Sequence, residues 1–168
     1  MEISFSIIVV SDSVYNGERE DVSGEIARNM LLERGYRVIG KIIVPNDPKL
    51  ILKALRKSSM KSDVVILIGG TGPSPRDITI DLVENVAWRR LPGFGEFFRR
   101  ESFHEVGYRA LVSRAELYIL YDGTIAVVLP GSSNAVKTGL EILLSIIEHL
   151  VEETKRFEGP HRIHHEEK

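Results

Sequence analysis

The sequence predicts an α/β fold with a mostly parallel, mixed β-sheet. Two continuous apolar runs, over residues 3–10 and 64–68, are typical of strands that are buried on both faces of a parallel sheet. Three strand–helix pairs follow one another in the first half of the chain, which favours parallel strands joined by right-handed crossovers. The chain of 168 residues is expected to form a single domain over residues 1–151, followed by a polar, flexible tail over residues 152–168.

The first two strand–helix pairs are delimited by capping residues and prolines. The first strand ends at Ser11-Asp12, and after a polar loop Ser23 is expected to cap a helix over residues 24–33. The second strand covers residues 36–44. It closes at Pro45-Asn46-Asp47-Pro48, where the second proline suits the first turn of the next helix.

The third strand runs into a glycine-rich turn, and the helix after it is expected to end near Val86. The next predicted helix, over residues 92–103, contains four of the six phenylalanines. Phe94, Phe97 and Phe98 share one face of it, a pattern that is more often a core or subunit contact than a ligand cage.

The last part of the chain predicts a hairpin and a long helix. Residues 116–121 and 124–129 are expected to be strands, because Asp122-Gly123 between them is a strong two-residue hairpin signal. If the second strand is parallel to its neighbours, the first is antiparallel, so the sheet is mixed. The long helix begins with Ser132 or Ser133 as its N-cap and ends where the tail begins. Its apolar residues cover more than one face, which favours contact with another subunit.

Composition argues against several classes of function. The formal net charge of −2 gives no argument for a nucleic acid or a membrane surface as partner. The chain has no cysteine, which excludes disulfides, thiolate metal sites and cysteine nucleophiles. No signal-peptide pattern opens the sequence and no segment resembles a membrane span, so a cytoplasmic location is expected. His161, His164 and His165 could bind a metal, although an unstructured tail is the favoured interpretation.

The segment 69–77 is the strongest signal for a binding site. Glycines after a buried strand allow positive φ and close approach of a ligand to backbone N–H groups, and the helix that follows favours an anion at its amino end. Neither the nucleoside-triphosphate loop nor the dinucleotide fingerprint matches, because no Gly-Lys pair follows and a proline replaces the third glycine. A purely structural turn is the alternative, but Arg76 and Asp77 beside Thr71 and Ser74 favour a site.

Polar clusters follow each of the four strands that are expected to be parallel, and the ends of such strands meet where α/β sheets bind ligands. Aspartates beside phosphates repel one another unless a cation intervenes. Mg²⁺ suits this position because it binds through one or two carboxylates together with phosphate oxygens. The pattern therefore predicts phosphoryl or nucleotidyl transfer, in which the protein positions groups and neutralises charge. The clusters are Ser11-Asp12, Asn46-Asp47, residues 69–77 and residues 131–134.

Several longer motifs occur in order over about residues 3–151. They are Ser11-Asp12, Asp21-Val22-Ser23-Gly24, Gly69-Gly70-Thr71-Gly72 with Arg76-Asp77, Pro92-Gly93-Phe94-Gly95-Glu96, Ser113-Arg114-Ala115 and Leu129-Pro130-Gly131-Ser132. This set resembles the MoaB/MogA family of molybdenum cofactor biosynthesis proteins, which includes the G domain of gephyrin, and the short chain is similar to the MoaB branch. The resemblance implies a three-layer α/β/α fold, assembled as a homotrimer or homohexamer. It also implies Mg²⁺- and ATP-dependent adenylylation of molybdopterin with release of pyrophosphate, before hand-off to a metal-insertion protein.

The resemblance also implies roles for individual residues. Asp77 matches the acid that the family assigns to metal and nucleotide. Glu96 and Ser102 match polar positions on the pterin side. The remaining expected contacts to nucleotide or substrate are Asp12, Gly70, Thr71, Gly72, Ser74, Arg76, Pro130, Gly131, Ser132 and Ser133.

One departure from the family pattern concerns the second acid. The family usually has Pro-Asp after its second strand, whereas this chain reads Pro45-Asn46-Asp47. Asp47 is expected to supply the carboxylate one residue later, acting with Asp77 in catalysis and in binding Mg²⁺; otherwise this acid is missing. The alternative function is a non-catalytic molybdopterin-binding carrier or scaffold. Molybdenum and tungsten both remain open as the metal of the pathway.

Overall fold

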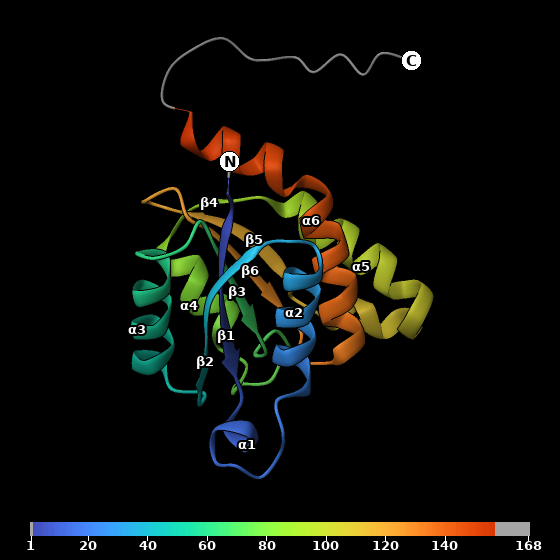
Figure 1. The fold of residues 1–168 in the computed structure, drawn as a ribbon. Coiled ribbons are helices and arrows are strands. Elements are labelled where there is room, and N and C mark those ends of the chain that lie inside the picture. The colour runs from blue at the N-terminus through green and yellow to red at the C-terminus, as the bar shows by residue number, and fades with distance from the viewer. Residues whose placement is uncertain (1, 157–168) are drawn as a thin grey trace.

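The computed structural model describes residues 2–156, and the tail histidines named above lie outside this range. Within it, six β-strands form one sheet in the middle of the molecule (Figure 1): β1 (Ser4–Val10), β2 (Arg37–Val44), β3 (Val64–Ile68), β4 (Ala87–Arg90), β5 (Glu116–Leu120) and β6 (Ile125–Leu129). The strand order is β2-β1-β3-β6-β5-β4. β2, β1, β3 and β6 pair in parallel, whereas β5 is antiparallel to both of its neighbours. The prediction of a mixed, mostly parallel sheet is confirmed.

Helices cover both faces of the sheet (Figure 1). One face is covered by α2 (Val22–Glu33), α5 (Pro92–Val106) and α6 (Ser133–Lys155), and the other by α3 (Pro48–Ser59) and α4 (Thr79–Val86). Two shorter elements, α1 (Asp12–Tyr15) and the 3₁₀ helix η1 (Gly107–Val112), complete the described chain. The expected three-layer α/β/α arrangement is confirmed.

The central strands are apolar throughout because each of their faces meets a separate core. In β3, Val64, Ile66 and Ile68 pack beneath α2, α5 and α6, while Val65 and Leu67 pack beneath α3 and α4. All five side chains are at most 1% exposed. In a strand that is buried on both faces, every side chain lies in a core, so polar residues do not alternate with apolar ones as they do in a half-exposed strand. This explains the continuous apolar run in the sequence.

The N-cap of α2 differs from the predicted one. The helix begins at Val22, and the Asp21 carboxylate caps it by accepting from the N–H of Gly24 at 2.8 Å. Lys41 on β2 donates to the same carboxylate at 2.5 Å, which holds Asp21 in place. Ser23, the predicted cap, instead donates its hydroxyl to the carbonyl of Gly131 at 2.6 Å. Both residue types are good caps, and the tertiary contact with Lys41 favours Asp21.

The last helix is longer than predicted. α6 continues past Val151 to Lys155, whose ammonium pairs with Asp63 at the start of β3. Residues 152–155 of the predicted tail are therefore helical. Ser132 is the N-cap of α6, which was one of the two expected candidates. Among the described residues, no helix is long and apolar enough to cross a membrane.

Candidate active site

Two glycine-containing turns lie side by side at the carboxyl ends of the neighbouring strands β3 and β6. The backbone N–H of Gly69, in the first turn, donates to the carbonyl of Leu129, which precedes the second turn, at 2.8 Å. A Cβ atom on Gly131 would lie only 3.9 Å from the Cα of Gly69. The structure thus places next to each other two turns that are far apart in the sequence and were both expected to bind anions.

The first turn requires glycine at two positions. Gly69 and Gly70 have φ angles of 107° and 73°, as the sequence led us to expect. A side chain on Gly69 would collide with the carbonyl oxygen of Val10, and one on Gly70 would collide with the hydroxyl of Thr79. That hydroxyl is buried and has no hydrogen-bond partner among the described residues. Both the backbone angles and the close packing therefore exclude larger residues here.

Asp77 folds back over the first turn. Its backbone N–H donates to the carbonyl of Ser74 at 2.9 Å, and its Oδ2 accepts from the N–H of Ser74 at 3.1 Å. The same oxygen lies so close to Gly72 that a Cβ atom there would approach it to 2.6 Å. Two of the predicted residues of this turn, Gly72 and Ser74, therefore lie against the Asp77 carboxylate, and the backbone N–H of Ser74 binds one of its oxygens.

The second turn borders a cavity of about 520 Å³. Its lining includes Gly131, Ser132 and Ser133 from this turn, together with Ser11 and residues 19–23. Ser132 accepts from the N–H of Ala135 at 3.3 Å as the cap of α6, so the amino end of this long helix faces the cavity. An amino end of this kind favours an anion, which fits the predicted role of the turn.

Asp12 joins three of the predicted clusters. The Asn46 backbone N–H donates to its Oδ1 at 2.8 Å, and the Asn46 side-chain amide donates to its Oδ2 at 3.3 Å. Arg76, from the first turn, forms an ion pair with Oδ2. The backbone hydrogen bond from Asn46, followed by its side chain and Arg76, holds the pKa of Asp12 below the ordinary value. The ends of β1, β2 and β3 are therefore connected through one carboxylate.

Asp47 has a different local role from its neighbour Asn46. Its Oδ1 accepts from the N–H of Leu50 at 2.9 Å, and this bond caps α3, with Pro48 in the first turn as predicted. Its side chain is half-buried, and its Oδ2 has no partner among the residues that the structure describes. Thus Asn46, and not Asp47, contacts Asp12.

Residues 6–149 match the family described as "Probable molybdopterin binding domain". The chain belongs to the molybdopterin-binding domain family. The match spans nearly all of the predicted domain, and it confirms the resemblance that the sequence motifs indicated.

Relatives of this family agree in fold and in name. A molybdopterin adenylyltransferase from Pyrococcus furiosus is 43% identical over 155 residues, covering 90% of each chain. Molybdenum cofactor biosynthesis protein B from Bacillus subtilis is 32% identical over 154 residues, covering 89% of each chain. The crystal structure of the tungsten cofactor synthesizing protein MoaB from Pyrococcus furiosus matches with a TM-score of 0.85 at 40% identity, covering 92% of this chain and 98% of that one. These similarities confirm the expected fold and family. The enzyme class expected from the sequence, molybdopterin adenylyltransferase, is the one that the first of these relatives is named for.

The donor chemistry expected for Mg²⁺ in this molybdopterin-binding domain is compatible with the observed carboxylates. Among residues 2–156, no group of three or more His, Asp or Glu side chains gathers as a metal site. Mg²⁺ does not require such a group, since it commonly arrives with phosphate and uses one or two carboxylates. Asp77 and Asp47 each have one oxygen held by a backbone N–H. Their other oxygens are hard ligands of the kind that Mg²⁺ prefers.

The two residues expected on the pterin side, Glu96 and Ser102, lie on α5. Glu96 is exposed and lines a groove of about 540 Å³ formed with Arg99, Phe103 and their neighbours on α5 and η1. Ser102 is 9% exposed and faces the interior. No hydrogen bond of the described chain joins either residue to the two turns.

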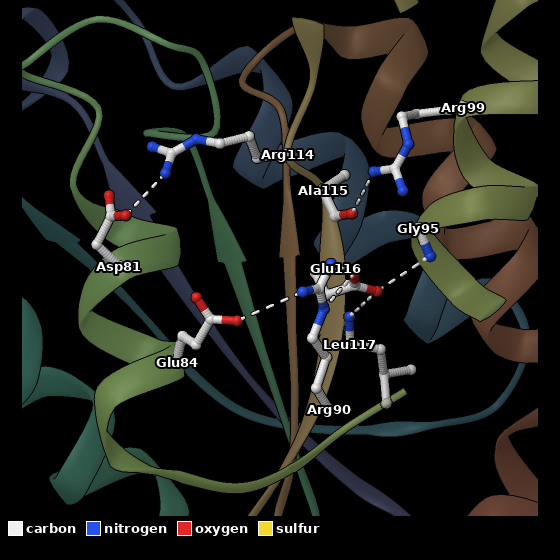
Figure 2. Close-up of polar contacts among 9 residues, drawn as sticks. All are labelled: Asp81, Glu84, Arg90, Gly95, Arg99, Arg114, Ala115, Glu116 and Leu117. Atoms are coloured by element: carbon white, nitrogen blue, oxygen red, sulfur yellow. Dashed lines mark hydrogen bonds and ion pairs between the residues drawn. The ribbon is translucent and has the colours of Figure 1, made fainter. Parts of the chain in front are cut away.

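Sequence reasoning did not predict two contacts that support the site. Arg114 binds the first turn through the carbonyl of Gly72. Glu116 holds the start of α5 by accepting from the N–H of Gly95 (Figure 2). Glu116 is 1% exposed; its Oε1 accepts from the N–H groups of Gly95 and Leu117, and its Oε2 pairs with Arg90. The signal for both residues was their place in or beside the Ser113-Arg114-Ala115 motif, which adjoins a buried strand.

Proposed function

We propose that this protein is a molybdopterin adenylyltransferase that uses Mg²⁺ and ATP as expected from its sequence. The observation that supports this most directly is the contact between the two glycine turns, joined by the 2.8 Å hydrogen bond from Gly69 to Leu129. Together they offer one nucleotide two sets of backbone N–H groups, beside the Asp77 carboxylate. The names of the relatives support the same activity.

The transfer forms a bond between an acceptor oxygen of molybdopterin and the α-phosphorus of ATP, and it breaks the bond from that phosphorus to pyrophosphate. In this proposal Gly70, Thr71, Gly72 and Ser74 bind phosphate in the first turn, and Pro130, Gly131, Ser132 and Ser133 form the second anion site. Asp12 and Arg76 orient the nucleotide that lies between the two turns. Glu96 and Ser102 bind the pterin part of the substrate. Mg²⁺, when bound with ATP, neutralises phosphate charge, and Asp77 and Asp47 are the residues that would hold it.

A non-catalytic molybdopterin carrier is the second candidate, and Asn46 is the observation that favours it. An asparagine stands where the family usually has an acid, and its side chain is engaged with Asp12 at 3.3 Å. If Asp47 does not replace the missing charge, the site keeps its anion-binding turns but lacks one metal carboxylate. Such a protein would bind molybdopterin without releasing pyrophosphate.

We also propose that the protein assembles as a homotrimer or homohexamer. Six large apolar side chains on α5 and η1 are between 42% and 79% exposed: Phe97, Phe103, Val106, Tyr108, Leu111 and Val112. Clusters of this kind are uncommon on monomers and favour contact between subunits. The cytoplasmic location and the recipient metal-insertion protein stay predictions.

Release of pyrophosphate from ATP and Mg²⁺, measured with and without molybdopterin, tests the activity. We expect release that depends on molybdopterin and is lost in Asp77→Asn, because the amide keeps the fold of the turn but brings no charge. Binding of molybdopterin without any release would favour the carrier. Unchanged release in Asp77→Asn would remove Asp77 from the proposed machinery.

A further inference from the structure

Arg114 connects the first glycine turn to the start of β5. Its backbone N–H donates to the carbonyl of Thr71 at 2.9 Å. Its guanidinium donates from Nε to the carbonyl of Gly72 at 3.1 Å and from Nη2 to the carbonyl of Asp77 at 2.7 Å. The third nitrogen, Nη1, pairs with Asp81 on α4 at 2.8 Å (Figure 2). One residue therefore binds the first part of the turn, its last part and the helix that follows.

These bonds determine which way the turn's amides point. In a trans peptide the carbonyl and the next N–H point in opposite directions. Because the carbonyl of Thr71 points toward Arg114, the N–H of Gly72 in the same peptide points away from Arg114. Likewise, the carbonyl of Asp77 points toward Arg114, so the N–H of Ile78 points away from Arg114. Neither of these N–H groups has a hydrogen-bond partner in the described part of the chain, and Ile78 starts α4 without a side-chain cap. Arg114 thus directs two unpaired donors away from itself.

The guanidinium donates to the protein from each of its nitrogens. All three of its nitrogens donate to protein oxygens, and the side chain is 35% exposed. The hydrogen bond to Asp81 raises the pKa of Arg114 and lowers that of Asp81, so both groups stay charged and largely neutralise each other. Three of its five N–H groups are used in these bonds, so experiment must distinguish positioning from a direct contact between Arg114 and a phosphate.

We propose that Arg114 is the positioning residue of the first turn: it touches no substrate but sets the direction of the Gly72 and Ile78 N–H groups toward the nucleotide phosphates. This inference rests on the proposed function for the identity of the anion. The planar guanidinium is essential to this positioning role. It can donate to two carbonyls and a carboxylate at once from fixed directions, which the single ammonium of a lysine cannot.

Amide hydrogen exchange tests the positioning without any ligand. In Arg114→Ala we expect faster deuterium uptake in a peptide that covers residues 69–81 than in the wild type. The matched control is Arg37→Ala, which removes an exposed arginine at the start of β2. Equal uptake in Arg114→Ala and wild type would show that the turn holds its shape without Arg114, and would overturn the inference.

Binding tests the functional consequence. We expect the Kd of Mg-ATP to rise by about 10–100-fold in both Arg114→Ala and Arg114→Lys, by analogy with the loss of residues that orient the ligands of a metal ion. The Kd of molybdopterin and the melting temperature of Arg114→Lys should stay near those of Arg37→Ala. Wild-type affinity in Arg114→Lys would indicate a charge effect or a direct phosphate contact, and would contradict positioning.

The same measurements separate failure of the inference from failure of the proposed function. A parallel loss of affinity for both ligands, together with a lower melting temperature, would assign Arg114 a purely structural role and overturn the inference. Absence of Mg-ATP binding in the wild type would instead contradict the proposed function. In that case the exchange experiment alone decides whether Arg114 positions the turn.

Discussion

The Asp12 carboxylate accepts two hydrogen bonds from Asn46, one from the backbone N–H at 2.8 Å and one from the side-chain amide at 3.3 Å. Asp12 follows β1 and Asn46 follows β2, so this contact joins the carboxyl ends of two neighbouring strands, on the same side of the sheet as the glycine turns. Arg76 reaches the same carboxylate from the first turn. The ionised state of Asp12 is therefore part of what holds three strand ends together.

The first prediction concerns pH. The pKa of Asp12 is lowered in the folded protein, mainly by the Asn46 backbone hydrogen bond. A carboxyl whose folded pKa lies below its unfolded value stabilises the fold above the unfolded value, and this stabilisation is lost as pH falls through the folded pKa. We expect the melting temperature of the wild type to fall more steeply below about pH 4 than that of Asp12→Asn. Thermal unfolding followed by circular dichroism over this range measures the difference, and parallel curves would contradict the prediction.

The second prediction separates the two roles of Asp47. Asn is as good an N-cap as Asp, so Asp47→Asn should leave the free energy of unfolding nearly unchanged, whereas Asp47→Ala should lower it by about 1 kcal/mol. If Asp47 supplies the second acid, Asp47→Asn should still reduce pyrophosphate release by roughly 100-fold or more, as for loss of a group that stabilises developing charge. Urea unfolding and the release assay together measure this. Full activity in Asp47→Asn would show that Asp47 does not replace the acid.

The third prediction concerns the buried carboxylate of Glu116. Glu116→Ala leaves the N–H groups of Gly95 and Leu117 without their side-chain acceptor and removes one of the two carboxylate partners of Arg90. We expect a loss of about 1–3 kcal/mol in the free energy of unfolding, because two buried N–H groups lose their acceptor, whereas Arg90 is 52% exposed and stays solvated. Glu84→Ala, which removes the exposed partner of Arg90 at 3.6 Å, is the control and should change it by less than about 1 kcal/mol. Similar effects of the two variants in urea unfolding would refute the assigned role.

The fourth prediction concerns assembly. If α5 and η1 form a subunit contact, a charge at Leu111 or Tyr108 should be buried unpaired in the interface and should favour dissociation. Light scattering coupled to size-exclusion chromatography should give three or six chains for the wild type and a smaller number for Leu111→Glu. A wild-type monomer would contradict the proposal, as would an unchanged mass in both Leu111→Glu and Tyr108→Glu.

Much of the fold follows from local sequence because the central strands are buried on both faces, which leaves a continuous apolar run at β3. β4 was not predicted, since Trp88, Arg89 and Arg90 have no apolar period and become a strand only by pairing with β5. The cap of α2 was misassigned because Asp21 and Ser23 are both suitable, and only Lys41 on another strand distinguishes them.

The same limit applies to the site. The turn from Ser74 to Asp77 is held by bonds between near neighbours, so its residues could be predicted from the sequence together with the family resemblance. The contact between Asp12 and Asn46 depends on the pairing of β1 with β2, and that of Arg114 with Gly72 depends on the position of β5. Neither contact could be predicted from the sequence near these residues, because each depends on how distant strands pair in the sheet.

The bond from Gly69 to Leu129 has a consequence for synthesis of the chain. The first turn is translated long before β6, and until β6 enters the sheet between β3 and β5 the Gly69 N–H has no acceptor there. A nascent chain that ends before the second turn therefore contains only half of the proposed nucleotide site. If nucleotide binds as proposed, it should bind only after most of the domain has left the ribosome, and it should stabilise the completed domain without assisting the early steps of folding.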